Sequence, residues 1–372
     1  MEKMKLGIIG MGEIGIDYAR KALDEDKCSG VLLLAVCDSD PKSLEKAQDE
    51  MPDSVKVYSN AVEMLDSGTV DSCIICSSNY ERMTYLAECV KRNINVMIVN
   101  PVGAYTKQIS SAAAEFGESK SVICTAFEER TDPLYIRLKR IIDSGEFGKI
   151  KRMSMIYTDC YRTNAYYDGE KGALKTGFAT TGGGIIINEC FEKLDMICSL
   201  IGLPKTVQSV LHMNKHRKIN CEDDAFAYFE FENGATGTFT TSIGDAPGTD
   251  RFEIDFDCGK IVCEDGILKI WQSETAESEW ASSCACGVEK PEYEYYEYKP
   301  KFDKSGKTGI INSFADKVNG EDGFAADIHE AKNALTLCNA IYLSAFLGRT
   351  VEIPFDEDLY YKELLKAVKA TR

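Results

Sequence analysis

The chain has 372 residues, of which 44% are hydrophobic and 28% are charged, a composition typical of a globular protein with two domains. Its formal net charge of −17 repels phosphate backbones and anionic lipid surfaces, so we expect no nucleic-acid and no membrane partner. The uncharged apolar runs are of strand length, far below the ~20 residues that span a bilayer, and the N-terminus has no signal-peptide pattern.

The fifteen cysteines are odd in number and lie mostly in apolar strand-like or helix-like runs. We therefore expect reduced, largely buried thiols in a cytoplasmic protein. Cys73 and Cys76 have the spacing of a redox motif, but residues three apart in a strand face opposite sides. We predict no metal site, either at Cys284–Cys286 or at His212 and His216.

Strand and helix patterns alternate through the first 127 residues. Apolar strand-like runs occupy residues 5–9, 31–37, 70–76, 95–99 and 121–127. Helical patterns occupy residues 14–23, 43–50, 61–65, 82–91 and 107–116. Several of the strand-like runs are apolar throughout, which is typical of parallel strands covered on both faces. The alternation predicts a doubly wound α/β domain over residues 1–128.

A glycine-rich turn, Gly10–Gly15 (GMGEIG), ends the first strand and opens the first helix. In this context Gly10 permits a tight turn, Gly12 lets a pyrophosphate approach the backbone, and Gly15 lets the helix pack on the strand. The helix N-terminus offers unpaired N–H groups to phosphate. A plain tight turn is the alternative interpretation. The residues expected at a dinucleotide from this turn are Gly10, Gly12, Glu13, Ile14 and Gly15.

Asp38 closes the second strand, 23 residues beyond Gly15. A carboxylate there can accept hydrogen bonds from the adenosine ribose and would repel a 2′-phosphate, so the sequence favours NAD over NADP. A helix cap or turn residue is the alternative. Ser77, Ser78 and Asn79 follow the run 70–76, where we expect them to line the nicotinamide side of the cofactor; an ordinary polar turn is the alternative.

A second domain begins at about residue 129, with a helix over residues 133–144 and a strand over 149–158. The stretch Tyr161–Gly184 is then polar, aromatic and long enough to suggest a functional or mobile loop. Tyr161 and Tyr166 could cover the C–H face of a polyhydroxylated ligand while Arg162 binds its hydroxyls. An ordinary surface loop is the alternative.

Gly182–Gly184 leads into a pattern that we interpret as one helix running to about Ile201, on which Asn188 and Glu192 share a face. Antiparallel strand signals follow at residues 206–213, 225–231, 236–243, 251–256, 260–263 and 268–271. Residues 274–307 are acidic and Tyr-rich without clear periodicity, which suggests a surface excursion. Two helices, a short strand and a last helix complete an α+β domain over residues 129–372.

The chain resembles the glucose–fructose oxidoreductase and inositol dehydrogenase (Gfo/Idh/MocA) family over nearly its whole length. The resemblance is carried by Gly10–Gly15, Asp38, Asn100–Gly103, Ser144–Ile150, Gly182–Gly184 and Asp245–Thr249. It implies a Rossmann domain followed by an α+β domain with a large open, mainly antiparallel sheet, with Asn100 and Pro101 at the cofactor. It also implies hydride transfer between NAD(P) and a hydroxyl carbon of a sugar, cyclitol or related substrate, in a homodimer or homotetramer.

Two departures from the family pattern concern proton handling. The family usually has Glu-Lys-Pro after the fifth strand, and its Lys polarises the reacting hydroxyl; this chain has Val99, Asn100 and Pro101. On the glycine-rich helix the family usually has an Asp and, four residues on, a His, where this chain has Asn188 and Glu192.

Oxidation of an alcohol requires a group that takes the hydroxyl proton. An amide cannot take a proton near neutral pH, whereas a carboxylate can. We therefore expect Glu192 to act as the base and Asn100 and Asn188 to orient the substrate, with Tyr161 or Tyr166 assisting. The substrate set is then Arg162, Tyr161, Tyr166, Asn188 and Glu192; a surface carboxylate paired with a Lys is the alternative for Glu192.

Three functions follow from this pattern. The first is an NAD-dependent oxidoreductase acting on a hydroxyl of a sugar, cyclitol or glycoside. The second is a catalytically degenerate NAD-binding sensor or subunit. The third is a non-redox enzyme, such as a lyase or glycosidase, that uses transient oxidation by bound NAD.

Overall fold

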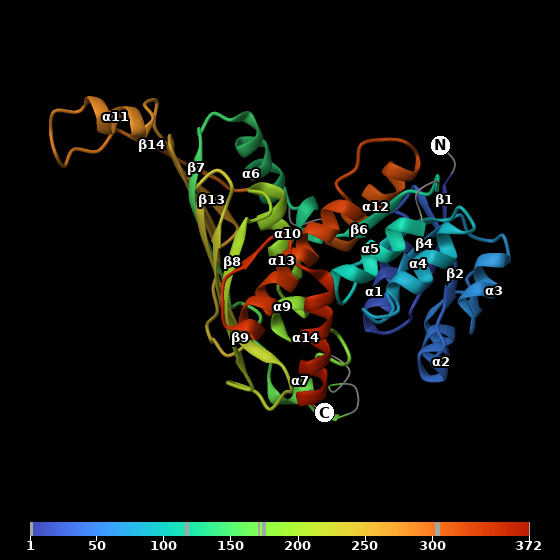
Figure 1. Cartoon of the computed structure of the whole chain (residues 1–372). Coiled ribbons are helices and arrows are strands. Elements are labelled where there is room, and N and C mark those ends of the chain that lie inside the picture. The colour runs from blue at the N-terminus through green and yellow to red at the C-terminus, as the bar shows by residue number, and fades with distance from the viewer. Residues whose placement is uncertain (1–2, 116–118, 170–171, 173–175, 302–305, 372) are drawn as a thin grey trace. The chain divides into compact units, whose positions relative to one another are not determined.

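The computed structural model describes residues 3–115, 119–169, 172, 176–301 and 306–371. The described chain forms two compact units, each discontinuous in sequence (Figure 1). The first unit contains residues 1–131, 180–182 and 305–335, and the second contains residues 132–179, 183–304 and 336–372. Residues 170, 171 and 173–175 of the predicted Tyr161–Gly184 loop, and residues 302–305 of the acidic segment, lie outside the described residues.

The first unit is built on a seven-stranded sheet with the order β15-β6-β5-β4-β1-β2-β3. Its strands are β1 (Met4–Ile9), β2 (Val31–Cys37), β3 (Lys56–Tyr58), β4 (Ser72–Ile75), β5 (Asn95–Val99), β6 (Ile123–Ala126) and β15 (Ala326–Asp327). All neighbouring strands are parallel except β15, which pairs antiparallel with β6. This sheet confirms the predicted doubly wound Rossmann fold.

Helices surround this sheet and bury its strands on both faces. They are α1 (Glu13–Ala22), α2 (Pro41–Glu50), α3 (Ala61–Asp66), α4 (Arg82–Val90), α5 (Thr106–Glu115), η1 (Glu128–Thr131) and α12 (Gly306–Val318). Leu6, Ile8 and Ile74 of the central strands are fully buried, which explains why these strands read as unbroken apolar runs. Ile310 and Phe314 of α12 belong to the same hydrophobic core.

The second unit is built on a nine-stranded sheet with the order β14-β13-β12-β11-β7-β10-β9-β8-β16. Its strands are β7 (Ile150–Tyr157), β8 (Thr206–Met213), β9 (Glu222–Glu230), β10 (Thr236–Ser242), β11 (Asp250–Phe256), β12 (Gly259–Glu264), β13 (Ile267–Gln272), β14 (Glu294–Tyr298) and β16 (Val351–Glu352). Neighbouring strands are antiparallel except β7 and β10. The large, mainly antiparallel sheet is therefore confirmed.

Helices lie on one face of this sheet, where Figure 1 shows α9, α10 and α14. The helices of the unit are α6 (Pro133–Ser144), α7 (Asn164–Tyr167), α9 (Ile185–Asn188), α10 (Phe191–Leu200), α11 (Glu277–Ser283), the later turns of α13 (Ile328–Leu347) and α14 (Glu357–Ala370). The acidic segment after β13 is more regular than expected. It contains α11 and the edge strand β14, which pairs with β13.

The prediction of a single helix after Gly184 is wrong, because two helices occupy that stretch. Helix α9 ends at Asn188 and α10 begins at Phe191. At the break the amide of Cys190 donates to the carbonyl of Ile185, five residues back, at 3.1 Å. Three consecutive β-branched isoleucines form α9, and crowding at such side chains disfavours a regular helix. Asn188 and Glu192 therefore lie on different helices and share no helix face.

All fifteen cysteines are free thiols, and most of them are buried. Within the described residues, no helix combines the length and apolar character needed to cross a lipid bilayer.

Candidate functional site

The carboxyl ends of the central parallel strands of the first unit meet at one edge of the sheet. The amide of Gly10 donates to the carbonyl of Cys37 at 2.8 Å, and the amide of Cys76 donates to the carbonyl of Ile9 at 2.7 Å. These bonds bring the turns after β1, β2 and β4 around a cavity of about 580 Å³. Five of the residues predicted for the cofactor line it, namely Gly10, Gly12, Asp38, Ser77 and Ser78.

The three glycines of the first turn differ in what surrounds them. Gly10 has φ +96°, and a Cβ there would lie 2.8 Å from backbone atoms of Cys76 and Ser77. A Cβ at Gly15 would lie 1.9 Å from the carbonyl oxygen of Gly10. The fold itself therefore requires glycine at both positions. A Cβ at Gly12 would meet no atom within 4 Å, so the space over this backbone is open to a ligand.

Asp38 holds this turn in place with both carboxylate oxygens. Oδ2 accepts a hydrogen bond from the amide of Met11 at 2.6 Å, and Oδ1 accepts one from the amide of Asp40 at 2.8 Å. A carboxylate offers about four lone-pair sites, so two remain for ribose hydroxyls. Ser77 Oγ, in the lining of the cavity, is a buried hydroxyl without a partner among the described residues. This donor and acceptor set, with the open backbone at Gly12, fits NAD.

The remaining predicted cofactor residues lie around this edge rather than in the cavity lining. Glu13 and Ile14 begin α1 directly after the turn. The side-chain amide of Asn79 is buried and donates to the carbonyl of Thr181 at 2.8 Å. Asn100 and Pro101 follow β5, and the side-chain amide of Asn100 donates to the carbonyl of Ala126 at 3.0 Å.

Arg82 ties the turns after β4 and β5 together, and sequence reasoning missed it. Its guanidinium donates to the carbonyls of Ser77 at 3.0 Å and Val99 at 2.7 Å, and also to that of Pro101. Only 4% of the residue is exposed, and this burial lowers the pKa of Arg82 to about 10, so it remains charged at neutral pH. A lone cation in a helical pattern usually indicates a solvated face, so nothing in the sequence distinguished Arg82 from a surface residue.

In the second unit, Arg162 forms an ion pair with Glu189. Nη2 of Arg162 lies 2.6 Å from Oε2 of Glu189, whose side chain is 14% exposed. The guanidinium also lies 5.1 Å from the ring centre of Tyr166, which packs edge-on against Tyr167. Glu189 sits in the break between α9 and α10 that the sequence did not predict, so its role was also missed.

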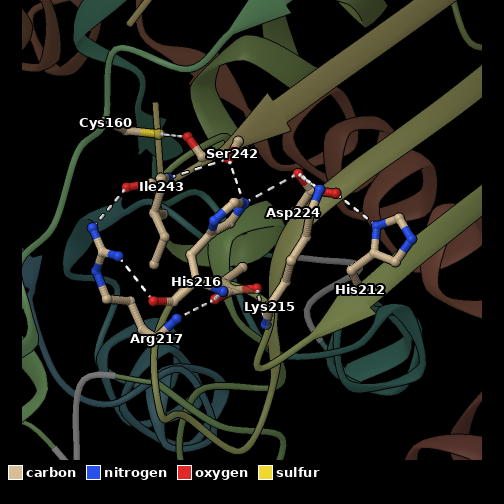
Figure 2. Close-up of polar contacts among 10 residues, drawn as sticks. Cys160, His212, Lys215, His216, Arg217, Asp224, Ser242 and Ile243 are labelled. Carbon is tan, nitrogen blue, oxygen red and sulfur yellow. Dashed lines mark hydrogen bonds and ion pairs between the residues drawn. The ribbon is translucent and has the colours of Figure 1, made fainter. Parts of the chain in front are cut away.

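Arg217, in the loop between β8 and β9, contacts Tyr161 and Arg162, and Figure 2 shows the bonds of its guanidinium to the carbonyls of His216 and Ile243. Its Nε donates to the carbonyl of Arg162 at 2.5 Å, and its guanidinium lies 5.1 Å from the ring centre of Tyr161. Arg217 therefore holds both the backbone of Arg162 and the ring of Tyr161. Tyr161 remains 48% exposed, which leaves its ring accessible to a ligand.

His212 on β8 and His216 in the following loop belong to an ion network centred on Asp224 (Figure 2). His212 Nδ1 lies 2.6 Å from Oδ1 of Asp224, and Lys215 Nζ lies 2.7 Å from Oδ2. His216 Nε2 lies 3.5 Å from the same Oδ2 and 3.2 Å from Ser242 Oγ. The described residues contain no group of three or more acidic, His or Cys side chains suited to a metal ion.

The predicted proton-handling residues are distributed over both units. Asn100 belongs to the first unit, and Asn188 and Glu192 belong to the second. The side-chain amide of Asn188 donates to the carbonyls of Gly183 at 3.2 Å and Gly184 at 2.8 Å. Glu192 is partly exposed and lies in the first turn of α10.

Both halves of the chain match models of one protein family. A model described as an oxidoreductase family with an NAD-binding Rossmann fold matches residues 4–127. A model described as the GFO/IDH/MocA C-terminal domain matches residues 135–262.

Several curated proteins are similar to the chain. Myo-inositol 2-dehydrogenase of Thermotoga maritima is 23% identical over 93% of this chain and 100% of its own length. The scyllo-inositol 2-dehydrogenase (NAD(+)) of Bacillus subtilis is 25% identical over 64% of this chain and 67% of its own. Inositol 2-dehydrogenase 2 of Saccharopolyspora erythraea is 24% identical, and the match spans 62% of this chain and 64% of that protein.

Solved structures share the fold. The WlbA dehydrogenase from Bordetella pertussis, in complex with NADH and UDP-GlcNAcA, superposes with a TM-score of 0.76 at 18% identity, covering 95% of this chain and 100% of that one. A levoglucosan dehydrogenase in complex with NADH and levoglucosan also gives a TM-score of 0.76, at 15% identity, covering 95% and 100%.

Proposed function

Because the chain belongs to the GFO/IDH/MocA family of oxidoreductases, whose NAD-binding Rossmann fold forms its first unit, we propose that it is an NAD-dependent oxidoreductase acting on a hydroxyl of a sugar, cyclitol or glycoside. The observation that carries this proposal is the cavity after β1, β2 and β4, where Gly12 leaves open backbone and Asp38 retains free acceptor sites. The similar inositol dehydrogenases support the substrate class.

Bound NAD would supply the hydride acceptor, and the residues of the first unit would hold it. The turn at Gly12 and the N-terminus of α1 would receive the pyrophosphate, because its backbone N–H groups and helix dipole attract anions. Asp38 would accept the ribose hydroxyls and disfavour a 2′-phosphate. Arg82 would fix the position of Ser77 through the carbonyl of Ser77 itself, and that of Asn100 through the carbonyl of the preceding Val99.

The second unit would supply the substrate contacts. The accessible ring of Tyr161 and the ring of Tyr166 suit the C–H face of a polyol. Arg162 and Glu189 offer both donors and acceptors, and their opposite charges compensate each other at 2.6 Å. This compensation favours a neutral, hydroxyl-rich ligand over a strongly charged one, because an anion would have to compete with Glu189 for the guanidinium.

Glu192 would take the hydroxyl proton as the C–H hydride leaves, while the amides of Asn100 and Asn188 orient the hydroxyl. A well-placed base typically contributes about 10²–10⁴-fold to the rate. We also propose a homodimer or homotetramer as the working assembly.

The test is incubation of the purified protein with NAD and a panel of inositols, sugars and glycosides. Accumulation of reduced cofactor supports the proposal. Products formed without net reduction would indicate the non-redox alternative, and NAD binding without any turnover would indicate a sensor.

The variant Glu192→Gln should lower kcat by at least about 10²-fold without weakening NAD binding. Glu277→Gln is the matched control, because Glu277 also lies in the first turn of a helix in the second unit. Turnover by Glu192→Gln at the wild-type rate would remove this carboxylate from the mechanism.

A further inference from the structure

Glu222 is a fully buried carboxylate beneath the glycine turn of the second unit. Oε1 accepts hydrogen bonds from the amide of Gly184 at 2.9 Å, the amide of Ile186 at 3.1 Å and the hydroxyl of Tyr342 at 2.6 Å. Oε2 lies 3.0 Å from the same Gly184 amide. Two of the backbone donors that a helix leaves unpaired at its N-terminus, here those of α9, are thus satisfied by one side chain.

The glycines of this turn make room for that arrangement. A Cβ at Gly183 would lie 2.0 Å from the hydroxyl of Tyr342. A Cβ at Gly184 would lie 2.1 Å from the backbone oxygen of Glu222 and 3.0 Å from its Cδ. Strand β9, helix α13 and the start of α9 therefore meet at contacts that no larger residue at 183 or 184 could accommodate without movement.

Burial disfavours the charged form of this carboxylate, yet the chain places it among three hydrogen-bond donors. Burial raises the pKa of Glu222 to about 7, and the hydrogen bonds from Tyr342, Ile186 and Gly184 only partly offset that effect. The titratable groups that face it are Tyr342 and Cys338 on α13, Cys190 after α9 and Cys221 on its own strand. Burial raises the pKa of each of these groups, so they are neutral at pH 7 and supply no balancing charge.

We propose that Glu222 is a positioning residue: it fixes the start of α9, and through this four-residue helix it sets where Asn188 presents its side chain to the substrate. The helix is too short to keep its own geometry, since α9 contains only Ile185–Asn188 and ends at the break before α10. Asn188 is itself bonded to the carbonyls of Gly183 and Gly184, so a shift of this turn moves it directly. The inference rests on the proposed function of Asn188.

The variant Glu222→Gln tests it in the full-length chain. Its amide nitrogen would replace one carboxylate oxygen and face the Gly184 or Ile186 N–H, donor against donor. Hydrogen exchange at Gly184 and Ile186 should rise about tenfold, the effect of losing one charge-assisted bond. With a substrate that turns over, kcat should fall about tenfold or more while the affinity for NAD stays unchanged.

Asp356→Asn is the matched control, because Asp356 also accepts from two N-terminal amides of a helix, those of Asp358 and Leu359 in α14. It should leave exchange at residues 184–188 and kcat at wild-type levels. An equal loss of kcat in this control would overturn the proposal, as would unchanged exchange and kcat in Glu222→Gln.

Tyr342→Phe decides the question if Glu222→Gln fails to fold. This variant removes one hydroxyl donor to Glu222. It should raise hydrogen exchange at Gly184 and lower kcat, as Glu222→Gln does, but by smaller factors. No change in either quantity would overturn the proposal. If no polyol is oxidised at all, the proposed function fails, while the exchange measurement still decides whether Glu222 holds α9.

Discussion

The backbone amide of Met11 donates to Oδ2 of Asp38 at 2.6 Å, so the glycine turn after β1 is anchored by the residue expected to read the ribose. Asp38 thus shapes the pyrophosphate turn and can also contact the cofactor. A change at this position should therefore alter cofactor affinity more than a single lost hydrogen bond would suggest.

Asp38→Asn should weaken NAD binding by about tenfold or more, since hydrogen bonds to a charged group contribute about 1.5–3 kcal/mol. Binding of NADP should weaken less, because the repulsion of its 2′-phosphate is relieved. Calorimetric titration with both cofactors measures the two effects. Asp71→Asn is the control, since Asp71 accepts from the amide of Lys5 at 3.0 Å outside the cavity lining; an equal loss in both variants would contradict the prediction.

Gly12→Ala should separate cofactor binding from stability. Because a Cβ at Gly12 meets nothing within 4 Å, the free energy of unfolding should stay within about 0.5 kcal/mol of wild type. The added methyl group should nevertheless occupy the space expected for the pyrophosphate, so NAD affinity should fall severalfold. Wild-type affinity in this variant would place the cofactor elsewhere.

Gly10→Ala should show the opposite behaviour. Its positive φ of +96° and the backbone atoms 2.8 Å from a Cβ predict a loss of about 1–3 kcal/mol in the free energy of unfolding, measured by denaturant titration. A variant as stable as the wild type would mean that the turn relaxes freely.

Glu222→Gln should change the pH dependence of stability. In the folded chain the pKa of Glu222 is about 7, against an ordinary value of 4.5, so folding favours its protonated form. The stabilisation that the protonated Glu222 gives the folded chain is fully present below pH 4.5 and is lost as the pH rises through 7. Relative to the variant, the wild type should lose about 3 kcal/mol of unfolding free energy across this window. If the free energies of unfolding of the wild type and the variant change with pH in the same way, the raised pKa of Glu222 is contradicted.

Arg162→Met should raise the KM for the polyol by about tenfold and affect NAD binding little, because the change removes the guanidinium N–H donors that would bind the substrate's hydroxyls. Arg152→Met is a suitable control. Arg152 also forms an ion pair from the second unit, with Asp255 at 2.7 Å, but its side chain is 61% exposed. A KM that rises equally in both variants would show that the effect is general destabilisation.

The sequence predicted those elements whose signal is local. Strands β1, β2, β4 and β5 are mostly buried and mostly apolar, and Gly10 and Gly15 are required by backbone geometry alone. The three-residue β3 and the two-residue β15 were missed, because strands so short carry no periodicity and depend on pairing with β2 and β6.

The residues that sequence reasoning missed depend on tertiary structure. Arg82 and Glu222 have the side chains of surface residues, and only the packed fold shows that the first binds three carbonyls and the second two amides and a hydroxyl. The break between α9 and α10, which places Glu189 beside Arg162, could not be predicted from the sequence, because the segments on both sides of it have helical patterns.

The core of the first unit includes Ile310 and Phe314, which follow eight of the nine strands of the large sheet of the second unit in the chain. A chimera that contained only residues 1–131 of the first unit would lack α12, and the apolar side chains that α12 covers would be exposed to water. The exchangeable module is instead residues 1–131 together with α12. During synthesis on the ribosome, its core cannot be completed until more than three hundred residues have been translated.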